Sequence, residues 1–281
     1  MTDPLVSTHW LAQRIEAGAV QVVDATWYMP NEDGDGRAEH LAGHIPGALF
    51  FDIDKIADQR SDLPHMLLSA EAFAEAAGAL GLRRDQVTVV YDARGIFSAP
   101  RVWWNLRVMG WPEVYVLDGG LKKWREEGRP VETGDVQPAA SRLEPRFEPS
   151  LVRSVDDVRA AIDEGGTQLV DARAAGRFTG EVPEPRAGLR SGHMPGARNV
   201  PWSNLVRADG TLLPADALKT AFETAGVDLG AAIVTTCGSG VSAGTLALGL
   251  ARLGRFDVAV YDGSWTEWGG RADTPVVTGP A

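Results

Sequence analysis

Short runs of β-branched and apolar residues alternate along the chain with longer segments in which apolar residues recur at helical spacing. The first half predicts helices and strands in alternation, at 7–18, 20–24, 69–81, 87–91, 99–109 and 114–117. The second half predicts the same alternation at 155–163, 168–170, 215–225, 231–235, 241–253 and 257–261. This order is typical of an α/β fold with mainly parallel sheets and helices on both faces, which binds ligands at the carboxyl ends of its strands.

The two halves of the sequence repeat each other. Gly43-His-Ile-Pro-Gly-Ala48 returns as Gly192-His-Met-Pro-Gly-Ala197, and the segment 114–124 returns 144 residues later as 258–268. Two tandem copies of one domain are therefore expected, at residues 1–140 and 141–281, joined by a proline-containing linker at about 131–151. His44 and His193 occur in both copies, which favours a role in the fold over a role in catalysis.

Composition narrows the class of protein. The chain has 281 residues, 44% of them hydrophobic, and a formal net charge of −11, which argues against nucleic-acid binding. Its single cysteine excludes an internal disulfide, and no spacing typical of metal ligands is present, so we expect no metal and no cofactor. Neither a secretory signal nor an apolar stretch of membrane-spanning length is apparent. A cytoplasmic protein without a membrane contact is expected.

That cysteine, Cys237, follows an expected strand and precedes an expected helix. Gly238 and Gly240 let the backbone curl around the sulfur, so that N–H groups and the positive end of the helix dipole can stabilise a thiolate. The alternative is a small buried hydrophobe, as most free cysteines are. The 144-residue offset places Ala93 opposite Cys237, so only one copy carries the thiol.

Cysteine phosphatases use a similar loop but close it with an arginine that grips the phosphoryl group. Alanine stands at that position here, Ala243, so phosphatase activity is disfavoured.

The loop Cys237-Gly-Ser-Gly-Val-Ser-Ala243, the paired Gly-His-Ile/Met-Pro-Gly-Ala elements, Ala99-Pro-Arg-Val-Trp-Trp104 and the segment 261–268 resemble tandem-domain rhodanese-type sulfurtransferases, in their 3-mercaptopyruvate branch. The resemblance covers nearly the whole chain. It implies sulfur transfer from 3-mercaptopyruvate to Cys237, with release of pyruvate and a persulfide intermediate, and then to a thiol acceptor such as thioredoxin or a small thiol, or to cyanide. A monomer is expected.

Two alternatives within this chemistry stay open. One is transfer from thiosulfate to cyanide, although the neutral Gly238 and Ser239 suit a thiosulfate dianion less well than a monoanionic thiol. The other is a persulfide carrier without catalysis of its own.

The resemblance also assigns further residues. It implies that Arg177 and Arg186 bind the substrate carboxylate and ketone, whereas the residues alone favour an exposed loop with incidental charges. Arg173 in the same stretch is expected in a structural ion pair. Gly238, Gly240, Val241 and Ser242 are expected to bind substrate through the loop backbone.

Proton transfer is the remaining role. The resemblance implies that Ser239, His65 and Asp54 carry it, the last two from the copy without a thiol. A surface position for His65 and a purely structural hydrogen bond for Ser239 are the alternatives.

Overall fold

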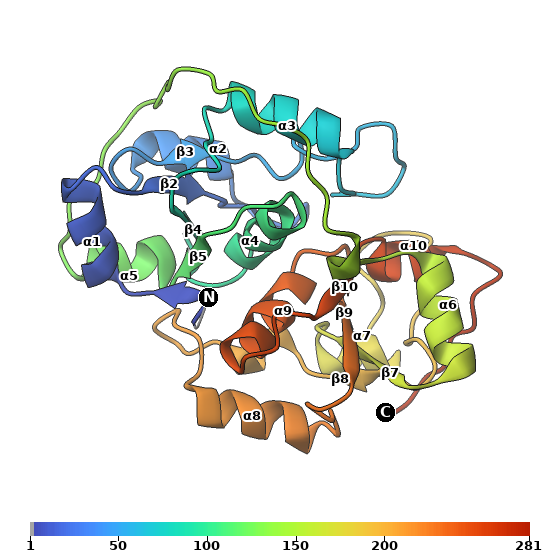
Figure 1. Ribbon diagram of the computed structural model, residues 1–281. Helices are drawn as coiled ribbons and strands as arrows, with labels where there is room; N and C mark the ends of the chain where they lie inside the picture. The colour runs from blue at the N-terminus through green and yellow to red at the C-terminus, as the bar shows by residue number, and fades with distance from the viewer. Residues whose placement is uncertain (1–2) are drawn as a thin grey trace. The chain divides into compact units, whose positions relative to one another are not determined.

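The computed structural model describes residues 3–281, which form two compact units (Figure 1). Unit 1 contains the described residues up to Gln59 together with Leu67–Glu148 and Arg207–Leu212. Unit 2 contains Arg60–Met66, Pro149–Val206 and Leu213–Ala281. Each unit therefore consists of most of one sequence half and one short segment of the other.

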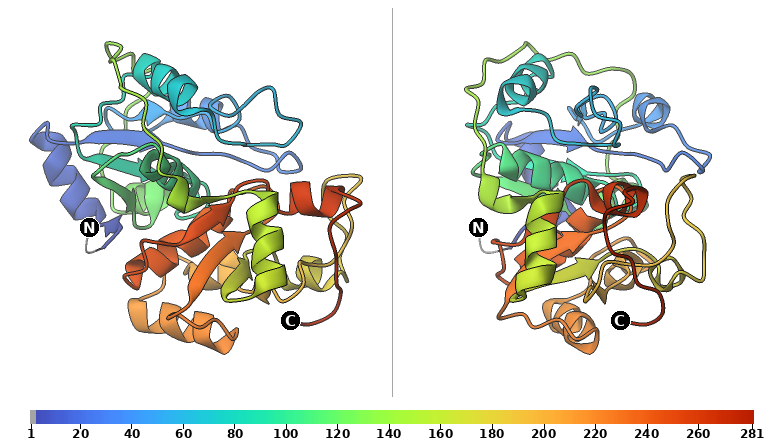
Figure 2. Two further views of the ribbon diagram at one scale, coloured as in Figure 1. Left: turned by 45° about the vertical axis from the view of Figure 1, so that its right-hand side comes forward. Right: turned by 90° about the vertical axis from the view of Figure 1, so that its right-hand side faces the viewer.

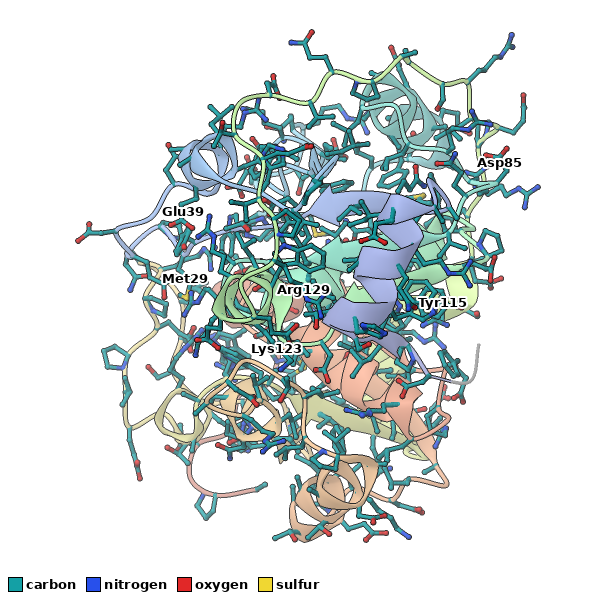
Figure 3. All side chains as sticks on the ribbon, turned by 90° about the vertical axis from the view of Figure 1, so that its left-hand side faces the viewer. Met29, Glu39, Asp85, Tyr115, Lys123 and Arg129 are labelled. Atoms are coloured by element: carbon teal, nitrogen blue, oxygen red, sulfur yellow. The ribbon has the colours of Figure 1, made fainter. Side chains whose placement is uncertain are left out.

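Unit 1 is a five-stranded parallel sheet in the order β1-β5-β4-β2-β3. Its elements are β1 (Leu5–Val6), α1 (Thr8–Glu16), β2 (Gln21–Asp24), α2 (Gly36–Ala42), β3 (Leu49–Phe50), α3 (Ala70–Ala79), β4 (Thr88–Tyr91), α4 (Ala99–Val108), β5 (Val114–Leu117) and α5 (Gly120–Glu126). Figure 1 shows α1 and α5 on one side of this sheet and α4 on the other. Trp10 of α1 packs on Tyr115 of β5, labelled in Figure 3, with ring centroids 6.1 Å apart.

Unit 2 repeats this plan in the order β6-β10-β9-β7-β8, again with parallel pairs. Its elements are η1 (Pro149–Leu151), β6 (Val152–Arg153), α6 (Val155–Glu164), β7 (Thr167–Asp171), α7 (Ala175–Thr179), β8 (Arg198–Asn199), η2 (Trp202–Leu205), α8 (Ala215–Thr224), β9 (Ala232–Thr236), α9 (Ala243–Arg252), β10 (Ala259–Tyr261) and α10 (Ser264–Gly270). Figure 2 shows α6 and α9 on opposite sides of the strands. The predicted α/β fold with two parallel sheets is confirmed.

Side-chain caps explain where several helices begin. Ser7 Oγ accepts the Trp10 N–H at 3.2 Å and starts α1, and Ser69 Oγ accepts the Ala72 N–H at 3.3 Å and starts α3. In unit 2, Ser154 and Asp157 form a capping box at the start of α6. These starts agree with the predicted elements.

The repeated tryptophans belong to the cores of the two units. Trp124 and Trp268 are each 1% exposed or less. Their indole N–H groups donate to equivalent carbonyls, Trp124 Nε1 to Pro130 O at 2.7 Å and Trp268 Nε1 to Pro275 O at 2.8 Å. A buried indole needs such a partner, so these side chains are fixed structural elements.

The repeated histidines also serve the fold. His44 Nδ1 lies 2.8 Å from His40 O, and His193 Nδ1 lies 2.9 Å from Phe178 O. Both rings are buried, and both backbones form an isolated antiparallel bridge to a segment that follows the last helix of their unit. This agrees with the structural role expected from their repetition.

The segment expected as a linker lies along unit 1. Ser141 N donates to Gly78 O at 2.9 Å, and Glu148 N donates to Val108 O at 2.7 Å. These bonds hold residues 141–148 to unit 1, whose segment Leu67–Glu148 includes them. The domain boundary near residue 140 stays a prediction.

Candidate functional site

Cys237 lies at the carboxyl end of β9, the central strand of unit 2. It is a free thiol and only 2% exposed. The helix behind it, α9, begins at Ala243 and not at Val241 as predicted. The reason is local: Gly244 N donates to Val241 O at 3.1 Å and Thr245 N donates to Ser242 O at 3.0 Å, so Val241 and Ser242 form a tighter three-residue turn after the left-handed Gly240. Residues 238–242 therefore form an open loop between strand and helix.

The start of α10 holds this loop by its carbonyl groups. Trp265 N donates to Cys237 O at 2.9 Å. Thr266 donates twice to Gly238 O, from its backbone N at 2.8 Å and from Oγ1 at 2.6 Å. Ser264 Oγ, fully buried, accepts the Cys237 N–H at 3.2 Å. Two loop carbonyls are thereby turned toward α10.

The amide groups of the loop are in a different situation. The backbone N–H groups of Ser239, Val241, Ser242 and Ala243 have no hydrogen-bond acceptor within residues 3–281. Unpaired N–H groups at the start of a helix form a site suited to an anion. We call residues 237–243 the Cys237 loop.

The equivalent position in unit 1 is Asp92, which corrects the predicted match to Ala93. Tyr91 is paired with Asp24 at the end of β2, and Thr236 is paired with Asp171 at the end of β7. The residue after Tyr91 is Asp92 and the residue after Thr236 is Cys237.

A second hydrogen bond agrees with this match. Leu121 N donates to Asp92 O, just as Trp265 N donates to Cys237 O. The 144-residue offset of the segment 114–124 does not hold before the helix start. Unit 1 has one residue more between Asp92 and its helix start, Ala99, than unit 2 has between Cys237 and Ala243.

The Asp92 carboxylate fills the unit 1 loop. Its Oδ2 accepts the N–H groups of Phe97, Ser98 and Ala99 at 2.9, 3.0 and 2.9 Å, and its Oδ1 accepts that of Arg94 at 2.9 Å. Burial raises the pKa of Asp92, and these backbone hydrogen bonds oppose the rise by stabilising the carboxylate. The loop of this fold can therefore surround an acidic group at the position where unit 2 carries the Cys237 sulfur.

A buried ion-pair network places one cation beside the Cys237 loop. Arg173 contacts Asp171 at 2.6 Å and Glu184 at 2.8 Å, which is the structural ion pair expected for it. The other oxygen of Glu184 contacts Arg177 Nη2, at 2.5 Å. Arg177 lies on α7, and a Cβ added at Gly238 would lie 3.0 Å from its Nη2. Arg177 thus occupies the space next to Gly238 where a side chain would otherwise stand.

Arg186 follows Glu184 in the same loop and is half-buried. The hydrogen bonds that join Arg173, Glu184 and Arg177 do not include it. Its predicted role in substrate binding stays a prediction.

The residues expected to transfer protons fall in different units. Ser239 and His65 are both buried, 6% and 7% exposed, and both belong to unit 2. His65 has a strained backbone with φ of +63°, which for a residue with a side chain often marks a functional position. Asp54 belongs to unit 1, where its carboxylate accepts the Trp27 indole N–H at 2.9 Å.

Glu184, Ser264, Thr266 and Asp92 are not found by sequence reasoning. Ser264 and Thr266 lie in the repeated segment 258–268, so the repeat marked their segment but not their contact with the Cys237 loop. Across residues 3–281, no helix is long and apolar enough to span a membrane. The same residues contain no group of three or more His, Cys, Asp or Glu that could hold a metal ion.

Comparison with known proteins identifies the family. The model of the rhodanese-like domain matches twice, at residues 7–127 and 154–271. The chain is 46% identical to the 3-mercaptopyruvate sulfurtransferase of Escherichia coli K12, over 98% of each chain. It is 43% identical to thiosulfate/3-mercaptopyruvate sulfurtransferase 1, mitochondrial, of Arabidopsis thaliana, over 98% of this chain and 78% of that protein.

The structure agrees with the crystal structure of SseA, described as a 3-mercaptopyruvate sulfotransferase from Escherichia coli, with a TM-score of 0.87 and 43% identity over 94% of this chain and 99% of that one. The two domain matches contain the Cys237 loop and every strand of the two sheets except the edge strands β1 and β6. The chain belongs to the rhodanese-like family and carries two rhodanese-like domains in tandem.

Proposed function

We propose that this protein is a 3-mercaptopyruvate sulfurtransferase in which Cys237 accepts the sulfur. The observation that carries the proposal is the Cys237 loop, in which the only thiol of the chain is followed by four backbone N–H groups that have no acceptor among the described residues. Relatives named for this activity, at 42–46% identity over nearly the whole chain, support the substrate.

In the first half-reaction, the Cys237 thiolate attacks the sulfur of 3-mercaptopyruvate. The substrate C–S bond breaks and its electron pair forms the enolate of pyruvate, which takes up the proton that the substrate thiol gives. Cys237 is left as a persulfide anion. In the second half-reaction, an acceptor thiolate attacks the outer sulfur and restores the Cys237 thiolate.

The loop backbone supports both anions. N–H groups that need no rearrangement stabilise charge in a buried site, and removing one such donor typically costs about 3–4 kcal/mol of transition-state stabilisation. The Asp92 carboxylate in unit 1, with its four N–H donors, supports this role for the equivalent loop of unit 2. In the proposal, Gly238, Gly240, Val241 and Ser242 bind the substrate through this loop.

The charges beside the loop favour 3-mercaptopyruvate over thiosulfate. Gly238 and Ser239 are neutral, and the nearby Arg177 already shares its charge with the buried Glu184. Where few cations are available, moving a dianion from water into the site costs more electrostatic free energy than moving a monoanion. Arg177 and Arg186 bind the carboxylate and ketone of the substrate in this proposal.

Proton transfer is assigned to Ser239 and His65, with Asp54 as the carboxylate that orients the histidine. The burial of Ser239 and His65 in one unit supports the first pair. A histidine beside a hydroxyl can move the proton from the substrate thiol to the enolate carbon.

The acceptor is proposed to be a thiol, either thioredoxin or a small thiol, or cyanide, and the protein is proposed to act as a cytoplasmic monomer. A single unpaired cysteine that must stay reduced supports a reducing compartment.

The test compares kcat/KM for 3-mercaptopyruvate and for thiosulfate with the purified protein, and repeats both with Cys237→Ser. We expect pyruvate release with a clear preference for 3-mercaptopyruvate, and none with the variant. Preference for thiosulfate would move the assignment to a thiosulfate sulfurtransferase. Sulfur held on Cys237 without turnover of either donor would indicate a carrier.

A further inference from the structure

The sequence assigns Arg177 to the substrate, but nothing in the sequence says what holds it in place. Its Nε and Nη2 donate to the two oxygens of Glu184, at 3.2 and 2.5 Å. The Glu184 side chain is 1% exposed, whereas that of Arg177 is 19% exposed. Burying a carboxylate this deeply costs free energy unless the carboxylate is paired. Glu184 is therefore the fixed member of the ion pair, and Arg177 is the partly exposed one.

Glu184 is itself held by a second buried arginine, Arg173. Arg173, fully buried, donates from Nη1 to Glu184 and from Nε and Nη2 to Asp171 at the end of β7. Its guanidinium also lies 4.1 Å from the centroid of the Trp265 ring. The network therefore runs from the sheet through two buried charges to the partly exposed Arg177.

The free side of Arg177 is what remains for a ligand. Nη1 has no hydrogen-bond acceptor among residues 3–281, and Glu184 uses only Nε and Nη2. Gly238 leaves open the space that Nη2 occupies. A guanidinium held on one edge and open on the other can form a charge-assisted hydrogen bond to a carboxylate at low entropic cost.

We propose that Glu184 is a positioning residue of the sulfur-transfer site, which holds Arg177 beside Gly238 with its Nη1 turned to the carboxylate of an α-keto acid. The inference rests on the proposed function and deepens it. Specificity for a carboxylate-bearing donor then comes from an arginine on α7 that is fixed by a buried carboxylate, and Gly238 must stay small because Arg177 fills its side-chain space.

The test measures KM and kcat for 3-mercaptopyruvate and competitive inhibition by pyruvate, which carries the same carboxylate and ketone. For Glu184→Gln we expect KM and the inhibition constant of pyruvate to rise together by about tenfold, with kcat changed less than threefold. Tenfold corresponds to about 1.4 kcal/mol, near the lower end of what a hydrogen bond to a charged group contributes. Glu181→Gln, an exposed glutamate in the same loop, is the matched control and should match wild type.

A purely structural role for Glu184, acting through Arg173, is separated by a double-mutant cycle. In an Arg177→Ala background, Glu184→Gln should leave KM and the pyruvate inhibition constant unchanged, because its effect passes through Arg177. Equal effects of Glu184→Gln with and without Arg177 would overturn the proposal. If the wild-type protein does not turn over 3-mercaptopyruvate at all, the proposed function fails instead.

Gly238→Ala gives an independent check, because its Cβ would push Arg177 Nη2 by only a few tenths of an ångström and leave the loop backbone unstrained. We expect a severalfold rise in KM for 3-mercaptopyruvate and in the pyruvate inhibition constant, with an unchanged unfolding midpoint. Unaltered pyruvate inhibition in Gly238→Ala would contradict the placement of Arg177.

Discussion

Replacing Asp92 by alanine removes the carboxylate that fills the unit 1 loop. Four backbone N–H groups lose their acceptor, and three of them belong to Phe97, Ser98 and Ala99, which are at most 5% exposed. A buried donor without an acceptor costs about 1–3 kcal/mol, so the three together cost about 3–9 kcal/mol. Burial of the carboxylate, which raises the pKa of Asp92, offsets part of this loss. We expect a net destabilisation of about 2–4 kcal/mol.

The assay is urea unfolding followed by tryptophan fluorescence, with amide hydrogen exchange at residues 97–99 as the local readout. Asp92→Asn keeps one acceptor oxygen and should lose less stability than Asp92→Ala. Asp85→Ala is the control, because Asp85 is an exposed partner of Arg83 and should change stability by less than about 0.5 kcal/mol. An Asp92→Ala protein as stable as this control, with unchanged exchange at 97–99, would show that the carboxylate does not hold the loop.

Three further predictions concern the Cys237 loop and the surface. Thr266→Val removes the 2.6 Å hydrogen bond from Thr266 Oγ1 to Gly238 O and should slow alkylation of the Cys237 thiol by iodoacetamide severalfold. Thr266→Ser keeps the hydroxyl and should restore the alkylation rate. Equal rates in the two variants would contradict the role of Thr266. Gly240→Ala and Gly47→Ala both place alanine at positive φ and should each cost about 1–2 kcal/mol of stability, but only Gly240→Ala should also slow alkylation. Burial would raise the pKa of Glu127, but hydrogen bonds from Thr8, Arg129 and Lys123 outweigh it and lower the pKa from 4.5 to about 2 (the two cations are labelled in Figure 3). The contribution of Glu127 to the free energy of unfolding is therefore present above pH 4.5 and lost as the pH falls toward 2. In urea unfolding, the stability of wild type should fall more steeply over this range than that of Glu127→Gln. Parallel curves of stability against pH would exclude the contribution.

The sequence was sufficient to predict the internal repeat and the central strands and helices of each unit. The strands β4 and β9 are runs of β-branched and apolar residues long enough to recognise, and the caps at Ser7 and Ser69 mark their helices. The edge strands β1, β3, β6 and β8 have two residues each, which is too short to show an alternation of apolar and polar residues in the sequence. They form because a neighbouring strand offers its unpaired edge.

The exchange of short segments between units also depends on long-range contacts. Residues 207–212 belong to unit 1 because Leu212 N donates to Asp118 Oδ1 at 2.8 Å and Lys122 Nζ donates to Ala208 O at 2.6 Å. These bonds join positions about ninety residues apart, and no local sequence pattern predicts them. The same exchange puts His65 in the unit of Cys237 although it comes from the other half of the sequence.

For the candidate site, the sequence located the thiol and the loop that surrounds it, while the supporting contacts required the structure. Glu184 looks like a surface charge in a proline-containing loop, and only its burial between Arg173 and Arg177 reveals its role. The match of Cys237 to Asp92 was missed by one residue, because a constant offset cannot reveal a loop that is one residue longer in one copy.

The central claim is that Cys237 in its backbone loop receives the sulfur of the donor. It is tested most directly by the intact mass of the protein after incubation with 3-mercaptopyruvate without any acceptor, with peptide mapping of the modified residue. We expect the mass of one added sulfur atom on Cys237, one pyruvate released per chain, and loss of the added mass when a thiol is supplied. Pyruvate release without a mass change on Cys237, or an unchanged yield from Cys237→Ser, would contradict it.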